Sequence, residues 1–411
     1  MTSKDWHSVD ALHSEEMVTH WRDHFSPPAL VNDLGCFQVM PDPMGIRDFL
    51  MPPFSGKGES TGMLYINRKH PASEDVPVGY TWYPDRVRRR ATIEGVEVET
   101  VTQAAAGEPA ALVRLTLTNA SSTPRRVEVG IKVAGQLVHT IDGWASMAPT
   151  IYHGWTDLCS GMDPKSEHPE RWRYDGEVGG MRFSSQPKAY SVHGTRPRPD
   201  RVEGKTFLYD VSLSAGDAWS LCFVVALGET EREAAERFIR LADGFDEASR
   251  QARQSWQEKI EAAFVPNNPI FSGHLPTFHT SEDNLARLYY TAFAGCLCCR
   301  RSNPLSRYGT TYVTLTPNNW TTASFLWDMM IAAPFYALLD PLVLRKMIKV
   351  WLEADLRKCH SVEYVTGKGL SNWYAVNNTA IVRLAYDYLR WSCLLYTSPS
   401  PRDRTRPRMP S

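Results

Sequence analysis

The period of the hydrophobic pattern divides the chain in two. From about residue 29 to 228, apolar and polar residues alternate, as in "ALVRLTLTN" (111–119), "RRVEVGIKV" (125–133) and "TFLYDVSLS" (206–214). Alternation with period two, interrupted by turn-forming stretches such as "NASSTP", predicts antiparallel strands with one face toward a core. No helical stretch interrupts this region. We therefore predict a large antiparallel β-sandwich over residues 29–228.

The pattern becomes helical after Thr230. The stretch "TERE" (230–233) has the spacing of a capping box, in which Thr230 and Glu233 satisfy the first free amides of a helix. Gly244 interrupts that helix, and a second apolar stripe at helical spacing runs from Phe245 to Phe264. These features predict a helical linker over residues 229–272.

Residues 273–393 continue as helices. Three stripes at helical spacing are visible: Leu285, Leu288, Tyr289, Ala292, Phe293 and Cys296; Val343, Leu344, Met347, Ile348, Trp351 and Leu352; Ile381, Leu384, Ala385, Tyr388 and Leu389. Between the first two lies "SFLWDMMIAAPFYALLDP" (324–341), which is apolar on every side and predicts a fully buried helix. Asp340 and Pro341 fit an N-cap followed by proline at the first helical position. Amphipathic helices alternating with a buried one predict two concentric helical layers.

The two ends differ from these regions. Residues 1–28 form an N-terminal extension without the apolar core of a signal peptide. Residues 394–411 combine proline and arginine with few apolar residues, which predicts a disordered tail. This tail resembles translated sequencing-adaptor read-through, so we expect the natural protein to continue beyond residue 393.

Composition narrows the function classes. Lys and Arg total 45 against 46 Asp and Glu, and this balance argues against nucleic acid or a charged membrane surface as partner. No run of 18 apolar residues occurs. The eight cysteines lack zinc spacing with matching histidines, and "CLCC" (296–299) fits buried thiols. We expect a cytoplasmic protein without a metal or other cofactor. The composition leaves its oligomeric state open.

Asp328 is the only charge in the apolar segment before Asp340. An ionised carboxylate there is costly unless it is paired, so its presence needs a reason. One interpretation is a structural ion pair with Arg300, Arg301 or Arg307. The other is a catalytic acid whose pKa is raised by burial, beside Trp327 as an apolar wall.

The order of these regions resembles the (α/α)6-barrel inverting glycosidases, in particular glycoside hydrolase family 63 and the mannosylglycerate-hydrolase type. The resemblance rests on "LARLYYTAF" (285–293), "NWTTASFLWDMMIAAP" (319–334) and "NWYAVNNTAIVRLAYDYL" (372–389). In that family a "FLWD" stretch carries the general acid, which falls on Asp328. The last segment is also similar to glycogen-debranching amylo-α-1,6-glucosidases, although Asn377 stands where those enzymes carry an acid. The resemblance implies a sandwich followed by the first part of an (α/α)6 toroid.

The same resemblance suggests further substrate-binding residues. Trp320, Trp327, Trp373 and Tyr374 would stack on sugar rings, although each is also ordinary core material. Asn377 and Asn378 would bond sugar hydroxyls, unless one of them is the N-cap of the following helix. Arg307 and Tyr308 lie where barrel loops shape the pocket.

The expected function is hydrolysis of an α-glycosidic bond with inversion, acting on an oligosaccharide or small glycoside. Asp328 would act as acid opposite a base roughly 6.5 to 9.5 Å away. A debranching enzyme, a glycoside phosphorylase and a non-catalytic carbohydrate-binding protein are the alternatives; for the last, Trp144, Trp155 and Trp172 are candidate contacts.

We expect this chain by itself to lack turnover and to expose apolar helix surface. Twelve helices need several hundred residues, but only about 120 lie between linker and tail. The carboxylates after Asp328 at positions 353, 355, 363 and 387 fit solvated stripes or loops rather than a base.

Overall fold

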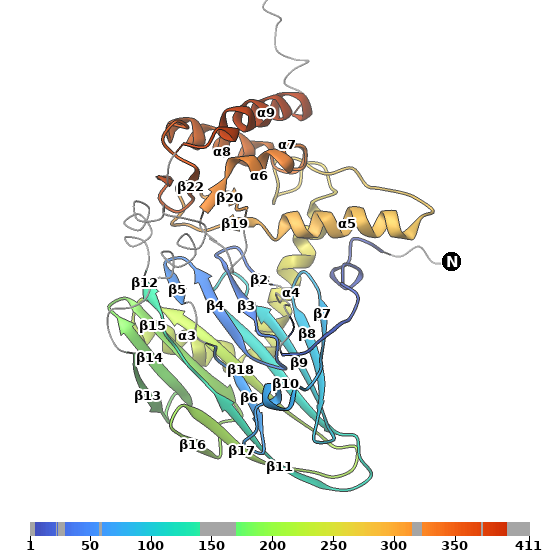
Figure 1. The fold of residues 1–411 in the computed structure, drawn as a ribbon, viewed down its shortest axis with the longest axis vertical. Helices are drawn as coiled ribbons and strands as arrows, with labels where there is room; N and C mark the ends of the chain where they lie inside the picture. Colours follow the sequence, from blue (N-terminus) through green and yellow to red (C-terminus); the bar gives the residue numbers. More distant parts are fainter. Residues whose placement is uncertain are drawn as a thin grey trace, which may run out of the picture.

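The computed structural model describes residues 5–21, 23, 29–56, 60–139, 170–314, 323–370 and 373–392. Figure 1 shows a β-rich body with a smaller helical body above it, joined by helix α4 (Phe245–Ala262). The strands come first in the chain and the helices afterwards, as the change of period near Thr230 predicts. No strands pair in parallel within the described ranges, so this part of the architectural prediction is confirmed.

A nine-stranded antiparallel sheet forms the back of the β body. Its strands, in spatial order, are β1 (Met17–Thr19), β7 (Val78–Trp82), β8 (Val87–Ile93), β9 (Val96–Ala104), β10 (Ala110–Asn119), β18 (Ala218–Gly228), β15 (Ala189–Arg196), β14 (Gly180–Gln186) and β13 (Arg171–Asp175). The alternating stretch 111–119 lies on its central strand β10. The predicted N-terminal extension is not separate from the sandwich, because β1 pairs with β7 through Met17 and Tyr80.

Two smaller sheets complete the body. One contains β16 (Arg201–Glu203), β17 (Thr206–Leu213), β11 (Arg125–Lys132) and β6 (Met63–Ile66); the other contains β12 (Val138–His139), β5 (Phe54–Gly56), β4 (Ile46–Met51), β3 (Cys36–Val39) and β2 (Ala29–Val31). Alternate residues of all three sheets share one hydrophobic cluster, which includes Val113, Val129 and Phe49. Burial of these apolar side chains is the main favourable term holding the sheets together.

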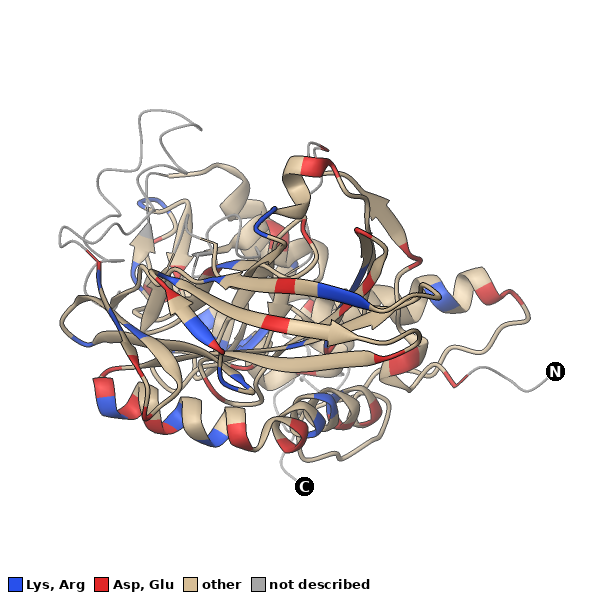
Figure 2. Cartoon of the chain, turned by 90° about the horizontal axis from the view of Figure 1, so that it is seen from below, with Lys and Arg blue, Asp and Glu red and all other residues tan. Residues whose placement is uncertain are grey.

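Helices cover part of the outer face of the large sheet, whereas the alternating pattern predicts that this face is exposed to solvent. Helix α3 (Glu231–Asp243) and the start of α4 cover part of it, and Phe238 packs on Leu112 and Val224. Thr230 caps α3 as predicted, since its hydroxyl accepts from the amide of Glu233 at 3.1 Å. Figure 2, which views the molecule from below, shows basic and acidic residues interspersed over the strands and helices.

The helical body contains α5 (Asp283–Leu297), α6 (Leu326–Ile331), α7 (Ala333–Leu339), α8 (Pro341–Glu353) and α9 (Val376–Trp391). It also contains short antiparallel strands: β19 (Arg300–Ser302), β20 (Thr310–Tyr312), β21 (Ala323–Phe325), β22 (Ser361–Glu363) and β23 (Gly369–Leu370). The segment 275–391 is therefore less purely helical than predicted, because the connections between helices pair with one another as strands.

Two details of the predicted helices are corrected. The stripe on α5 is displaced, because Ala286, Tyr290 and Leu297 are buried while Leu285 and Leu288 are exposed. The apolar segment is two short helices that meet at Ala332 rather than one fully buried helix, and Ile331 is 70% exposed. Exposed apolar side chains on the helical body were expected, and they also include Leu342, Leu352, Val382, Tyr386 and Leu389.

A buried carboxylate fixes the corner between α7 and α8. Asp340 takes the N-cap position of α8, but its side chain does not cap that helix. Its Oδ2 receives Arg300 Nε at 3.2 Å and the Tyr312 hydroxyl at 3.4 Å, and its Oδ1 receives the Ser272 hydroxyl at 2.9 Å. Asp340 thus joins the end of the linker, both strands of the β19–β20 hairpin and the α7–α8 corner.

Replacing Asp340 by alanine should lower the free energy of unfolding by about 3 kcal/mol, because the buried Arg300 guanidinium loses its counter-ion. Urea denaturation measures this change. Glu236→Ala is the matched control, since it removes an exposed pair with Arg232 on α3 and should leave stability unchanged. Equal stability of the two variants would contradict the role assigned to Asp340.

Candidate functional site

Asp328 is placed by the turn from β21 into α6. Phe325 ends the strand and is the N-cap residue of the helix, in extended conformation. Leu326 and Met329 then point into the core that α6 shares with α9. Asp328 lies in the first turn between these two residues, with its side chain partly buried rather than enclosed.

The arginine partners considered for Asp328 are engaged elsewhere. Arg300 pairs with Asp340, Arg301 donates to the carbonyl oxygens of Cys298 and of Arg300 at 2.7 and 2.8 Å, and Arg307 pairs with Glu353 at 2.5 Å. Within the described ranges, Asp328 forms neither a hydrogen bond nor an ion pair. The structural ion pair with these arginines is therefore wrong.

The environment of Asp328 favours its protonated form. Burial raises its pKa from 3.8 to about 6, because desolvation penalises the charged carboxylate. Burial also raises the pKa of the Cys299 thiol, and the Asp328 charge adds to that shift. Burial raises the Tyr336 pKa most, and nearby groups, including Cys299 and more weakly Asp328, add to that shift. Asp328 thus lies near Cys299, which follows α5, and near Tyr336 of α7.

A second chain segment meets this turn. Strand β22 pairs with β21, so that Ser361 lies opposite Phe325. The His360 ring packs edge-on against Phe325, with centroids 5.1 Å apart, and against Tyr374 at 4.4 Å. His360 therefore links Tyr374, just before α9, to Phe325, the N-cap residue of α6. Sequence reasoning missed His360, because no periodicity or motif marks a residue whose contacts come from three separate segments.

The aromatic candidates have different positions. Trp327 is 37% exposed, Trp373 is 55% exposed and Tyr374 is 36% exposed. These exposed rings leave surface for a ligand. Trp320 lies outside the described residues, as do Trp144 and Trp155.

Two predicted contacts are corrected by burial. Asn377 is fully buried, and its amide donates to the carbonyl oxygens of Cys359 and His360 at 3.1 and 3.2 Å. It therefore fastens the residue 359–360 turn to α9 and does not face solvent. Tyr308 is 1% exposed and packs in the core of the helical body. Neither side chain reaches a ligand in this arrangement.

The other polar candidates lie on the surface. Asn378 lines a shallow hollow of about 520 Å³ along α9 with Val382 and Tyr386. Neither asparagine is an N-cap, since Ala375 takes that position. Arg307 is held toward Glu353 at the end of α8.

The four carboxylates after Asp328 that were weighed as the catalytic base fall into two groups. Glu353 and Asp355 pair with Arg307 and Arg357, as solvated side chains do. Glu363 and Asp387 are fully buried, contrary to the sequence interpretation. Glu363 closes its own turn by accepting from the amides of Val365 and Thr366 at 2.8 and 2.5 Å, and Asp387 accepts from Arg383 at 2.6 Å. These bonds give both buried groups a structural role.

Over the described ranges, no three His, Cys, Asp or Glu side chains gather in a way that would hold a metal ion. None of the described helices is long and apolar enough to cross a membrane.

Comparison with solved structures identifies similar folds. A protein from the human microbiome assigned as a kojibiose phosphorylase matches with a TM-score of 0.57 and 10% identity, over 91% of this chain and 56% of that one. A bacterial glucoamylase in complex with acarbose matches with a TM-score of 0.55 and 7% identity, over 92% of this chain and 57% of that one. The chain thus spans a little over half the length of these structures. No family model matches it, and no curated protein does.

These likenesses concern the fold. They support a large antiparallel β domain followed by helices. Assignment to glycoside hydrolase family 63 and the complete (α/α)6 toroid stay predictions.

Replacing Asp328 by asparagine should stabilise the protein above pH 6 and leave its stability unchanged below about pH 4. The folded-state pKa of Asp328 is raised, so its protonated form contributes stability that is lost as the pH rises through about 6. We expect the free energy of unfolding of Asp328→Asn to exceed that of the wild type by about 1 to 2 kcal/mol at pH 7.5, after discounting for solvent screening. Urea denaturation at pH 4 and 7.5 measures the difference. A gain independent of pH would show that Asp328 is not desolvated.

Proposed function

We propose that the chain belongs to a glycoside hydrolase that cleaves an α-glycosidic bond of an oligosaccharide or small glycoside with inversion. The observation that carries this proposal is the Asp328 carboxylate, which is partly buried, has a pKa of about 6 and forms no ion pair in the described part of the chain. A structural carboxylate would have a partner, whereas a general acid needs its proton available for transfer.

The chemistry required of Asp328 is one proton transfer. Its carboxyl hydrogen passes to the glycosidic oxygen as the bond from that oxygen to the anomeric carbon breaks. A water molecule attacks the anomeric carbon from the opposite face and gives its proton to a carboxylate base. Asp328 is left ionised, and the base proton returns to it through solvent. Glu363 and Asp387 are both held by structural bonds, so neither is proposed as this base.

The exposed aromatic residues would bind the sugar. Trp327 adjoins the acid in sequence, Tyr374 is linked to the start of α6 through His360, and Trp373 precedes Tyr374 in the chain. Apolar faces of pyranose rings stack on such side chains, which would orient the glycosidic oxygen toward Asp328. Asn377 fastens the turn at residues 359–360 through its side-chain amide. Asn377 would therefore act indirectly, by positioning His360 and Tyr374.

The likeness to structures described as a kojibiose phosphorylase and a glucoamylase supports an enzyme that acts on glucosides. Phosphorolysis is the second candidate, since one of the two structures is assigned to it. It would use the same acid, with phosphate in place of water.

Asp328→Asn should lower kcat on the order of 10³-fold, because asparagine has no transferable proton. The assay uses the complete reading frame that encodes the chain, with maltose and kojibiose as substrates, and follows the released anomer by proton NMR. Parallel reactions with and without inorganic phosphate separate phosphorolysis from hydrolysis. Asp283→Asn, an exposed change at the start of α5, is the matched control and should retain activity. Near-normal turnover by Asp328→Asn would overturn the general-acid role.

The pH dependence of kcat/KM should show a limb near pH 6, with activity falling above it, because the acid must be protonated. Steady-state rates between pH 4 and 9 measure this limb. An activity that rises from pH 5 to 8 would instead place Asp328 in the role of a base.

A further inference from the structure

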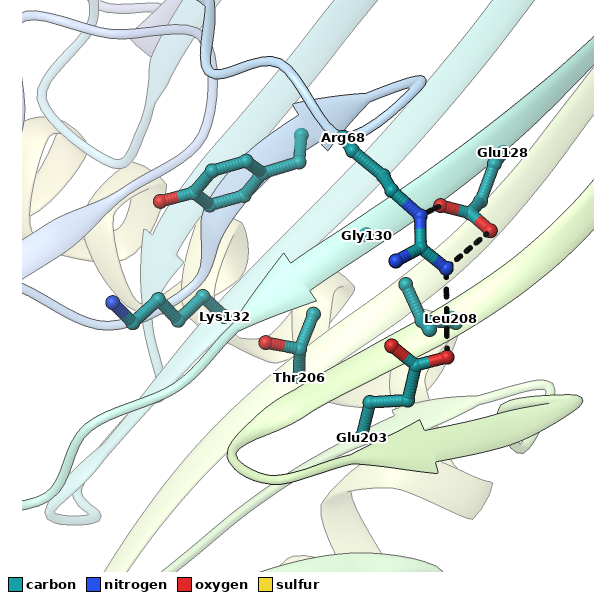
Figure 3. Close-up of a pocket in the computed structure, with 8 residues that line it drawn as sticks. Arg68, Glu128, Gly130, Lys132, Glu203, Thr206 and Leu208 are labelled. Atoms are coloured by element: carbon teal, nitrogen blue, oxygen red, sulfur yellow. Dashed lines mark hydrogen bonds and ion pairs between the residues drawn. The ribbon is translucent and has the colours of Figure 1, made fainter.

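A groove crosses the outer face of the four-stranded sheet (Figure 3). The strands of this sheet lie toward the opposite end of the molecule from α6, the helix that carries Asp328 (Figure 1). Its volume is about 310 Å³, at the lower end of the range for small-molecule sites. It lies over the middle of β11, with β6 on one side and β17 on the other. Sequence reasoning found no binding platform here, because the residues that line it come from four strands.

Gly130 forms the floor of the groove. It stands in the interior of β11, directly between Tyr65 on β6 and Leu208 on β17. Its backbone is not in the left-handed region, so the strand conformation does not require glycine. A Cβ atom there would lie 3.3 Å from Tyr65 Cβ and 3.4 Å from Leu208 Cδ2. Glycine weakens a strand interior and often marks the close approach of another molecule, and here its lack of a side chain keeps the groove open.

The walls combine apolar and polar groups. Tyr65 and Leu208 border the floor. Lys132 on β11 lies opposite Thr206 on β17, and each is two residues along its strand from the Gly130–Leu208 pair, on the same face of the sheet. No hydrogen bond or ion pair occupies the Lys132 ammonium or the Thr206 hydroxyl within the described ranges. An aromatic ring beside free donors and acceptors suits a ligand with an apolar face and polar edges.

The charges of the groove balance one another. Arg68 pairs with Glu128 at 2.9 Å and with Glu203 at 3.5 Å (Figure 3). With Lys132, the lining carries two bases and two acids, so its formal charge is zero. A polyanion would find no net attraction here, whereas neutral hydroxyl groups can donate to carboxylates and accept from the ammonium.

We propose that this groove is a second saccharide site, which binds a neutral pyranose ring over Gly130, between Tyr65 and Leu208, with its hydroxyls bonded to Lys132 and Thr206. The choice of a sugar rests on the proposed function, while the groove itself rests on the geometry of the sheet. Such a site would hold a longer glycan on the β body without taking part in bond cleavage.

Isothermal titration with maltoheptaose tests the proposal, using the complete reading frame in its Asp328→Asn form so that the probe is not consumed. Gly130→Val should fill the groove, and Tyr65→Ala should remove one wall. Each change should raise the dissociation constant of one class of maltoheptaose sites at least 10-fold. Ser212→Val is the matched control, since it adds the same branched side chain to the outer face of β17 outside the groove. Thermal unfolding checks the fold of each variant, and Gly130→Ala replaces Gly130→Val if the latter does not fold.

The outcomes separate this proposal from the proposed function. Unchanged titration of both groove variants, or binding of inorganic phosphate in place of the glycan, would overturn the second site. When Gly130→Val is made in the protein that retains Asp328, its kcat on maltose should equal that of the wild type, since the groove does not take part in catalysis. If the groove variants weaken glycan binding while Asp328→Asn keeps full turnover, the second site stands and the general-acid role is rejected. If the groove variants bind the glycan normally while Asp328→Asn loses turnover, the general-acid role stands and the second site is rejected.

Discussion

The carboxylate of Asp340 is the contact on which the geometry of the helical body depends. It is buried, and it accepts hydrogen bonds from the linker residue Ser272, from Arg300 on β19 and from Tyr312 on β20. A buried ion pair tolerates little displacement, because any loosening leaves a charge without solvent or partner. The corner between α7 and α8 is therefore fixed relative to the linker, and α6 with Asp328 is held through the core that it shares with these helices.

Two acids of the same segment thus have opposite environments. Asp340 has several donors and is only 2% exposed, whereas Asp328 is partly exposed and unpaired within the described ranges. The first arrangement stabilises a charge, and the second raises the pKa of Asp328 toward neutrality. Because Asp340 takes Arg300, this arginine does not serve Asp328 as a counter-ion. A structural pair and a candidate acid can therefore coexist only twelve residues apart.

The β body does more than carry the helices. Helices α3 and α4 cover part of the outer face of its large sheet, and its four-stranded sheet leaves a groove over Gly130. Both features depend on outward-facing residues such as Leu112 and Tyr65, and a period-two pattern does not tell what meets the outer face. The proposed acid and the proposed second site belong to separate bodies, and a glycan able to reach both would bind with the benefit of two contacts.

The sequence by itself determined the order of sandwich, helical linker and helices, because periods of 2 and 3.6 report which face of an element is buried. It also singled out Asp328, since a lone charge in an apolar segment is costly. Only the tertiary structure decided that Leu285 is exposed, that Asn377 is buried under residues 359–360, and that His360 joins Phe325 to Tyr374. These outcomes depend on contacts between residues distant in the chain, and local periodicity carries no information about which partner an element meets.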